Sequence, residues 1–194
     1  MKCIILAAGR GVRMMPLTMN TPKPLLKVKG KAIIDYVLES LPKEITEIII
    51  AVDYLGDQIK KHVGNNYKGR PVKYVQGSDE GNAYSFFATR KYLHDEDFLI
   101  IYGDEMPNKV NVKKCIDKKL SILTFMSEAV GTQDDGVMVL NTDIYNYFPT
   151  FSEKELHFHD LVDMFICDHD VNYVDAVDFI GEINTVKQLN KLNE

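Results

Sequence analysis

The sequence has no apolar run that approaches the ~20 residues of a membrane span, and no secretory apolar segment ahead of a cleavage site. Its three cysteines are odd in number and share no metal-like spacing, which is typical of reduced, mostly buried thiols. The chain also lacks internal repeats, linkers and low-complexity tracts. We therefore expect one domain over residues 1–194, in the cytoplasm and without a membrane partner.

Acidic side chains are absent from residues 1–34, which contain seven basic ones. The whole chain nevertheless has a net charge of −5, so the rest of it is strongly acidic. A basic segment on an acidic protein indicates a local site for a polyanion, whereas nucleic-acid binding usually needs a broader basic face. We expect no nucleic-acid partner.

Apolar runs alternate with amphipathic segments through the first half of the chain. Strands are predicted at residues 3–8, 47–52, 72–76 and 97–103, and helices at 32–41, 54–63 and 82–93. This alternation predicts right-handed β-α-β units and a mostly parallel sheet. In the less regular second half, strands are predicted at 120–126, 136–141 and 171–179, and helices at 142–148, 155–169 and after Thr185.

A long connection separates the first strand from the first helix and spans residues 9–31. Loops longer than ~12–15 residues are uncommon in compact domains and are usually functional or disordered. Apolar residues throughout this one argue against disorder. Gly9 and Gly11 let backbone N–H groups approach a ligand, Arg13 offers a planar fork to a phosphate, and Lys23 offers a mobile charge. The alternative is a solvated, lysine-rich turn.

The stretch LAAGRGVRMMPLTMNTPKPLLKVKGK resembles the signature of the sugar-1-phosphate nucleotidyltransferases, G-x-G-x-R-x-x-P-L-T followed by P-K-P-L-L. Val12 is a mild departure from this signature, because the family often has Thr or Ser at that position. The resemblance implies a Rossmann-like, nucleotide-diphospho-sugar transferase-like α/β fold with helices on its sheet. It also implies triphosphate binding by the residues that end the first strand and open the loop: Leu6, Ala7, Ala8, Gly9, Gly11 and Arg13. Residues 9–31 are called the signature loop below.

Asp104 follows Gly103 at the end of an apolar strand, where ligands bind in doubly wound sheets. A carboxylate there suits Mg²⁺, although an Asp that caps the next turn is the alternative. The resemblance implies a metal-binding Asp at this place, with Gly103 against the nucleotide. It places a second acidic ligand in FIGEINTVKQL, where Glu182 stands and Asn184 is a further candidate. We expect Mg²⁺ as cofactor, with Arg13, Lys23 and Asp104 as catalytic residues.

The segment VQGSDEGNA resembles the family's base-recognition segment, with Gln76 and Gly81 as the matching residues. An amide can satisfy a donor and an acceptor on a uracil or thymine edge. UTP or dTTP is therefore favoured, and CTP stays open. From the residues alone, a turn after a polar strand end is the alternative.

The region expected to bind the acceptor, which follows Asp104, is shorter than in the family. No Glu-Lys-Pro motif follows Asp104, and DDGVMVLNTDIY resembles the family's N-A-G-I-Y strand, with Gly136 at its Gly. The resemblance implies acceptor binding at Lys23 and Gly136. The pair His157 and His159 is interpreted as solvated helix surface, because alternate positions diverge around a helix.

These features favour a nucleotidyltransferase that couples a nucleoside triphosphate to a sugar 1-phosphate and releases pyrophosphate. The first alternative is a cytidylyltransferase for phosphocholine or a phosphonate, and the second is a non-catalytic nucleotide-sugar-binding or regulatory module. A glycosyltransferase is less favoured, because the metal strand ends in Gly-Asp-Glu rather than Asp-x-Asp. The partners expected are the triphosphate and a small phosphorylated acceptor, and a homo-oligomer stays open.

Overall fold

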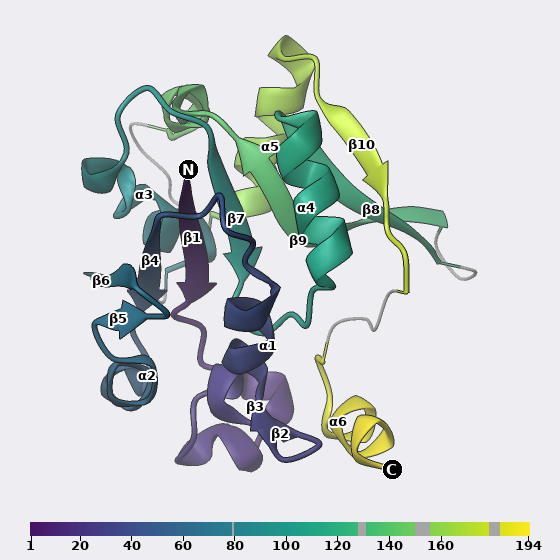
Figure 1. Ribbon diagram of the computed structural model, residues 1–194. Helices are drawn as coiled ribbons and strands as arrows, with labels where there is room; N and C mark the ends of the chain where they lie inside the picture. The colour runs from purple at the N-terminus through teal and green to yellow at the C-terminus, as the bar shows by residue number, and fades with distance from the viewer. Residues whose placement is uncertain (79, 128–130, 150–155, 179–182) are drawn as a thin grey trace.

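The computed structural model describes residues 1–78, 80–127, 131–149, 156–178 and 183–194 (Figure 1). Within these residues one mixed sheet has the strand order β10-β8-β9-β7-β1-β4-β6-β5. Its strands are β1 (Lys2–Ala7), β4 (Glu47–Val52), β5 (Asn66–Tyr67), β6 (Arg70–Gln76), β7 (Phe98–Tyr102), β8 (Ser121–Ser127), β9 (Gly131–Leu140) and β10 (Asn172–Asp175). Strands β7, β1, β4 and β6 are mutually parallel, and β9 runs antiparallel to both of its neighbours. The predicted mostly parallel sheet is confirmed.

Helices cover both faces of this sheet. They are α1 (Ile33–Ser40), α2 (Gly56–Val63), α3 (Asn82–Phe87), α4 (Lys109–Lys118), α5 (Phe158–Asp168) and α6 (Val186–Asn193). Helices α1, α2 and α4 contribute to the hydrophobic cluster on one face, whereas α3 and α5 contribute to the cluster on the other. The arrangement is the predicted α/β architecture.

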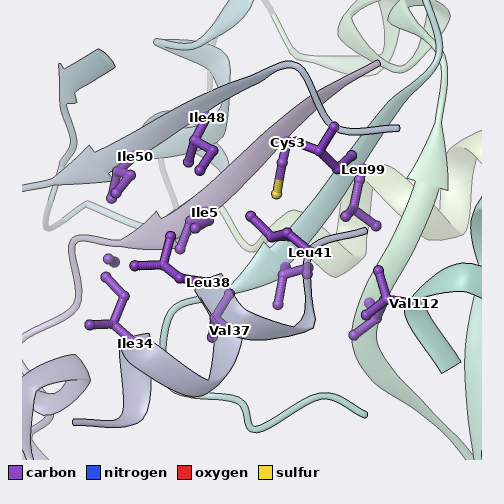
Figure 2. Packing of buried hydrophobic residues seen from close by; sticks show 14 of the residues in the cluster. Cys3, Ile5, Ile34, Val37, Leu38, Leu41, Ile48, Ile50, Leu99 and Val112 are labelled. Atoms are coloured by element: carbon purple, nitrogen blue, oxygen red, sulfur yellow. The ribbon is translucent and has the colours of Figure 1, made fainter. Parts of the chain in front are cut away.

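Side chains of β1 alternate between the two clusters. Cys3 and Ile5 belong to the cluster to which α1 and α4 contribute, and Figure 2 shows Ile5 beside Leu38 of α1. Ile4 and Leu6 belong to the cluster on the opposite face. All four are buried, and burial of an Ile or Leu side chain contributes about 1.5–3 kcal/mol relative to leaving it exposed. Burial on both faces explains why the strand is a continuous apolar run in the sequence.

A third, smaller cluster fixes the signature loop against the end of the chain. Its members come from the loop, the start of α1, the segment after β7 and the C-terminal segment: Met14, Leu26, Val28, Ile33, Met106, Ile183 and Leu189. The loop itself forms three 3-10 turns and the hairpin of β2 (Lys27–Val28) with β3 (Lys31–Ala32). Figure 1 shows α6 beside β2 and β3, below the carboxyl end of β1. The loop is therefore packed, as its apolar residues predicted.

Two helices differ from the prediction. The helix predicted at 82–93 ends at Phe87, and a separate 3-10 turn follows at Arg90–Tyr92. Thr89 is fully buried and its hydroxyl donates to the Phe86 carbonyl at 2.6 Å, which competes with the helical pattern. Helix α4 was not predicted, although Asn108 caps it by accepting from the Val110 N–H at 2.8 Å.

Smaller differences concern the second half. The segment predicted as a helix at 142–148 is a 3-10 helix over Thr142–Tyr147. Of the strand predicted at 171–179, the described residues 171–178 form a strand over Asn172–Asp175, and residue 179 lies outside the described residues. All three cysteines are free, with Cys3 and Cys115 buried, and burial raises the pKa of the Cys3 thiol. Among the described residues, no helix combines the length and apolar character that a membrane span requires.

Candidate active site

One pocket of about 700 Å³ lies where the carboxyl ends of the central strands meet the signature loop. Ligands in open α/β sheets bind outside these strand ends, as we expected from the sequence. The pocket is lined by residues from the end of β1, the signature loop, the segment after β6 with α3, the end of β7 and the residues after it, the start of α5 and the segment before α6: Leu6, Ala7, Ala8, Gly9, Arg10, Gly11, Val12, Arg13, Met14, Lys23, Pro24, Ser78, Gly81, Asn82, Ser85, Tyr102, Asp104, Glu105, His157, His159 and Asn184.

Gly11 shapes the first part of the signature loop. Its φ of +62° is a left-handed conformation, and a Cβ atom there would lie 3.1 Å from side-chain atoms of both Lys23 and Thr18. The buried Thr18 hydroxyl donates to the Gly11 carbonyl at 2.9 Å and closes the turn. At Gly9, by contrast, a Cβ would meet nothing within 4 Å, so its backbone borders open pocket space.

Lys23 is the buried cation of the pocket, with 7% of its surface exposed. Its Nζ forms an ion pair with the Asp104 carboxylate and donates to Asn184 Oδ1 at 3.0 Å. Pro22 and Pro24 flank it, and its 3-10 turn begins directly after Pro22. A buried charge needs paired partners, so Asp104 and Asn184 hold the ammonium in place.

Asn184 joins the two cations of the loop to the end of the chain. Its Oδ1 accepts from Arg13 Nη2 at 2.9 Å as well as from Lys23. Ile183 before it is fully buried in the third cluster, and Thr185 after it caps α6 by accepting from the Gln188 N–H at 3.2 Å. A buried neighbour on one side and a helix cap on the other therefore position this amide.

Close strand packing places Asp104 over the pocket. The Gly103 N–H donates to the Leu6 carbonyl at 2.8 Å, and a Cβ at Gly103 would lie 2.8 Å from Ala7 Cβ. A side chain at position 103 would push β7 away from β1. Gly103 thus acts through packing and does not line the pocket.

Two of the three predicted metal ligands lie in the described part of the chain. Asp104 and Asn184 both contact Lys23 Nζ and so lie together, whereas Glu182 lies outside the described residues. No cluster of three His, Cys, Asp or Glu side chains is found in the described part of the chain. Mg²⁺ commonly takes one or two carboxylates plus substrate phosphates, so the oxygen atoms of Asp104 and Asn184 fit it.

Of the two predicted base-recognition residues, Gly81 lines the pocket and Gln76 does not. Gly81 lines the pocket with φ +135°, and a Cβ there would lie 2.2 Å from the Leu156 carbonyl oxygen. The exposed Gln76 is not among the lining residues, and its Nε2 donates to Asp53 Oδ1 at 2.5 Å. The remaining predicted triphosphate contacts, Leu6, Ala7, Ala8, Gly9, Gly11 and Arg13, all line the pocket.

Gly136 supports the pocket wall from behind. It does not line the pocket, but a Cβ there would lie 2.6 Å from Tyr102 Cδ2 and 3.2 Å from Glu105 Oε1. The missing side chain lets Tyr102 and Glu105 occupy the wall. Sequence reasoning assigned neither of these two residues to the site.

His157 and His159, interpreted from the sequence as solvated helix surface, both line the pocket, with His157 exposed and His159 half-buried. His157 precedes α5 as its N-cap, in a capping box with Asp160, so the two side chains do not diverge around one helix. His159 Nε2 lies 3.1 Å from the Tyr102 hydroxyl. The capping pattern His-x-x-Asp was the available signal.

The model of the nucleotidyl transferase family matches residues 2–154. The chain belongs to this family. The match confirms the resemblance carried by the signature loop and includes Arg13, Lys23 and Asp104. Asn184 lies beyond the matched range.

Individual relatives are named for different nucleotidyl transfer reactions. The chain is 33% identical over 110 residues to the UTP–glucose-1-phosphate uridylyltransferase AglF of Haloferax volcanii, a match of 56% of this chain and 45% of that protein. It is 43% identical over 94 residues to a choline-phosphate cytidylyltransferase of Streptococcus pneumoniae, a match of 48% of this chain and 41% of that one. The chain thus spans less than half the length of the curated relatives it matches.

Solved structures confirm the fold. A Bacillus anthracis protein designated a candidate glucose-1-phosphate thymidylyltransferase superposes with a TM-score of 0.84 at 19% identity, over 99% of this chain and 93% of that one. At that identity the likeness shows the nucleotide-diphospho-sugar transferase-like architecture alone.

Proposed function

We propose that this protein transfers a nucleotidyl group from a nucleoside triphosphate to a sugar 1-phosphate and releases pyrophosphate. The observation that carries the proposal is the meeting of Lys23 with Asp104 and Asn184 beside the glycine-rich turn. Nucleotidyl transfer asks mainly for positioning and charge neutralisation, which two cations and a carboxylate in one pocket supply. Membership of the family supports the same reaction class.

The bond changes follow from this arrangement. Backbone N–H groups at Gly9 and Gly11 and the Arg13 guanidinium would hold the triphosphate. An oxygen of the acceptor phosphate attacks the α-phosphorus in line, and the bond from this phosphorus to the α–β bridging oxygen breaks. The electron pair leaves with pyrophosphate, and no covalent enzyme intermediate forms. Lys23 would orient the acceptor phosphate and offset the charge that grows in the transition state.

Mg²⁺ is part of the proposal. Asp104 and Asn184 would hold it, together with Glu182, and the bound ion would neutralise charge on the phosphate oxygens. Lys23, which pairs with Asp104 in this structure, would turn toward the substrate phosphates.

For the base we propose UTP or dTTP, with CTP as the next choice. Gln76 would exchange its bond to Asp53 for the pyrimidine edge, and Gly81, which lines the pocket, would lie against the base. Calorimetric titration of the five common triphosphates tests this. Tighter binding of ATP or GTP than of every pyrimidine triphosphate contradicts it.

A cytidylyltransferase acting on phosphocholine is the second candidate, favoured by the 43% identity to the Streptococcus pneumoniae protein. The experiment is pyrophosphate release, measured for each triphosphate with hexose 1-phosphates, phosphocholine and a phosphonate. Release with CTP and phosphocholine alone supports the second candidate. Tight triphosphate binding without release from any pair supports a non-catalytic binding module instead.

A further inference from the structure

Two side chains from the region where β4 leads into α2 hold the signature loop from outside the pocket. The Tyr54 hydroxyl lies 3.0 Å from the Thr18 carbonyl and 2.9 Å from the Met19 carbonyl, and donates to both. Gln58 Nε2 donates to the Asn20 carbonyl at 3.0 Å. Figure 1 shows α2 beside the loop. Three consecutive carbonyls of the loop thus accept from residues 54–58, called the anchor segment below, to which the proposed reaction gives no role.

The part of the loop that these donors reach is the 3-10 turn over Leu17–Met19. Leu17 and Met19 expose 40% and 58% of their surface, and Thr18 alone of the three is buried. Burial of apolar side chains therefore contributes little to holding this turn. The last carbonyls of a helical turn have no acceptor role within it and need donors from elsewhere. Hydrogen bonds from the anchor segment supply those donors.

Thr18 connects this turn to the glycine-rich turn before it. The Thr18 hydroxyl and the Met14 N–H both donate to the Gly11 carbonyl, each at 2.9 Å. A Cβ atom at Gly11 would lie 3.1 Å from side-chain atoms of both Thr18 and Lys23, so the turns are closely packed. A shift of the Leu17–Met19 turn would therefore move the backbone that is proposed to hold the triphosphate.

The anchor segment is itself fixed to the sheet. It follows β4, which ends at Val52 and pairs with β1 on one side and β6 on the other. Leu55 has a φ of +53°, a left-handed conformation that is uncommon outside glycine. The Gly56 N–H donates to the Asp53 carbonyl at 2.9 Å, and a Cβ at Gly56 would lie 3.0 Å from Val52 Cβ. A strained backbone persists where its surroundings hold it, so Tyr54 extends from a rigid element.

We propose that Tyr54 is a positioning residue for the triphosphate-binding part of the signature loop, with Gln58 as a weaker second anchor. This inference rests on the proposed function, in which Gly11 and Arg13 bind the triphosphate. A protein whose binding-competent form is only partly populated binds its ligand more weakly in proportion to that fraction. Without the Tyr54 hydroxyl, the turn leaves its competent conformation more often and triphosphate binding weakens. Lys23 has side-chain partners of its own, so turnover of bound substrate changes less.

Tyr54→Phe tests the proposal, because it removes one hydroxyl and keeps the ring. We expect the triphosphate Kd to rise by about 3- to 10-fold, while kcat at saturating triphosphate stays within about twofold. Gln58→Met removes the amide donor at similar length and should raise the Kd by about 2- to 3-fold, because water competes for the exposed Gln58. Tyr74→Phe is the matched control, because the Tyr74 hydroxyl donates to the Gly64 carbonyl at 2.6 Å, outside the pocket lining. It should bind triphosphate like the parent.

Amide hydrogen exchange of the ligand-free protein tests the same contact without turnover. The N–H groups of Met14, Met15 and Met19 donate within the two turns, and in Tyr54→Phe they should exchange about 3- to 10-fold faster than in the parent. Amides of β4 should exchange as in the parent, which shows that the variant folds. Tyr74→Phe should leave the loop amides unchanged.

Each contrary result overturns the inference in a different way. Unchanged exchange of the loop amides in Tyr54→Phe means that the hydroxyl does not hold the turn. Faster exchange with a parental triphosphate Kd means that the turn is held but plays no part in binding. A fall in kcat as large as the rise in Kd, or an equal rise in Kd in Tyr74→Phe, means general support of the fold. If the parent binds no triphosphate, the proposed function fails, and hydrogen exchange alone then decides whether Tyr54 positions the loop.

Discussion

The two ends of the pocket differ in how the chain builds them. The loop end takes Arg13 and Lys23 from one continuous stretch, where two glycines and two prolines fix the backbone. The opposite end, formed by Tyr102, Glu105, His157 and His159 and called the distal end below, joins Tyr102 to His159 across 57 positions, with Gly136 behind them. The residues proposed to bind phosphate thus lie in one local stretch, whereas the distal end depends on how separate elements pack.

Asp104 lies between the two ends and belongs to both. It pairs with Lys23 of the loop, and it directly precedes Glu105 of the distal end. The comparison predicts that a change at Asp104 affects turnover with every substrate, whereas a change at the loop end acts on the phosphates. Three variants test this comparison.

Asp104→Asn should have the largest effect. It removes the carboxylate proposed to hold Mg²⁺ and leaves the buried Lys23 without its anionic partner. We expect turnover to fall about 10²- to 10³-fold, by analogy with the loss of one electrostatic stabiliser. The measurement is steady-state pyrophosphate release in excess Mg²⁺, and chelation of Mg²⁺ should abolish release by the parent.

Asp57→Asn is the control for this variant, because the Asp57 side chain is almost fully exposed and pairs only weakly with Lys60 on α2. It should turn over like the parent. Full turnover of Asp104→Asn in excess Mg²⁺ would refute the metal assignment. A loss confined to one acceptor would instead indicate that Asp104 binds the acceptor.

The same contrast explains which features could be predicted from the sequence. The buried strands and the loop end were predictable, because apolar runs and a contiguous motif are local signals. Helix α4 was not predicted, although Asn108 caps it and Val112 and Cys115 are spaced as a buried helical face. The distal end could not be predicted, because only the fold brings Tyr102 beside His159.

Asn184 illustrates how far the role of a single residue could be predicted from the sequence. The sequence offered it as a metal candidate beside Glu182, but no pattern indicated that its amide oxygen accepts from both Arg13 and Lys23. Both hydrogen bonds depend on the packing of Ile183 against residues of the signature loop, which is a tertiary contact. The sequence motif therefore identified the two cations, Arg13 and Lys23, whereas only the tertiary structure identified Asn184 as their shared partner.

Lys23→Ala should have the next largest effect. The ammonium is proposed to act on charge that develops in the transition state, so kcat should fall by about 10²-fold while the triphosphate Kd changes much less. Equilibrium titration beside steady-state kinetics separates the two quantities. Lys27→Ala is the matched control, because Lys27 is an exposed lysine of the same loop. Parental binding and turnover in Lys23→Ala would show that the loop end is not catalytic.

Arg13→Ala should have the smallest effect of the three variants. Arg13 is exposed and bonds to Asn184 Oδ1 at 2.9 Å, so water screens part of its charge and the remaining bond from Lys23 still holds the amide. We expect the triphosphate Kd to rise by about 10-fold, which corresponds to ~1.4 kcal/mol, with the acceptor KM nearly unchanged.

Arg90→Ala, an exposed arginine beside the Phe87 ring and outside the pocket lining, is the control for Arg13→Ala and should bind triphosphate like the parent. Calorimetry gives the triphosphate Kd, and kinetics at saturating triphosphate gives the acceptor KM. The opposite split, a weakened acceptor with unchanged triphosphate, would contradict the division of the pocket into two ends. Equal losses of both would mean that Arg13 holds the fold of the loop rather than a phosphate, because collapse of the loop would displace Lys23 as well.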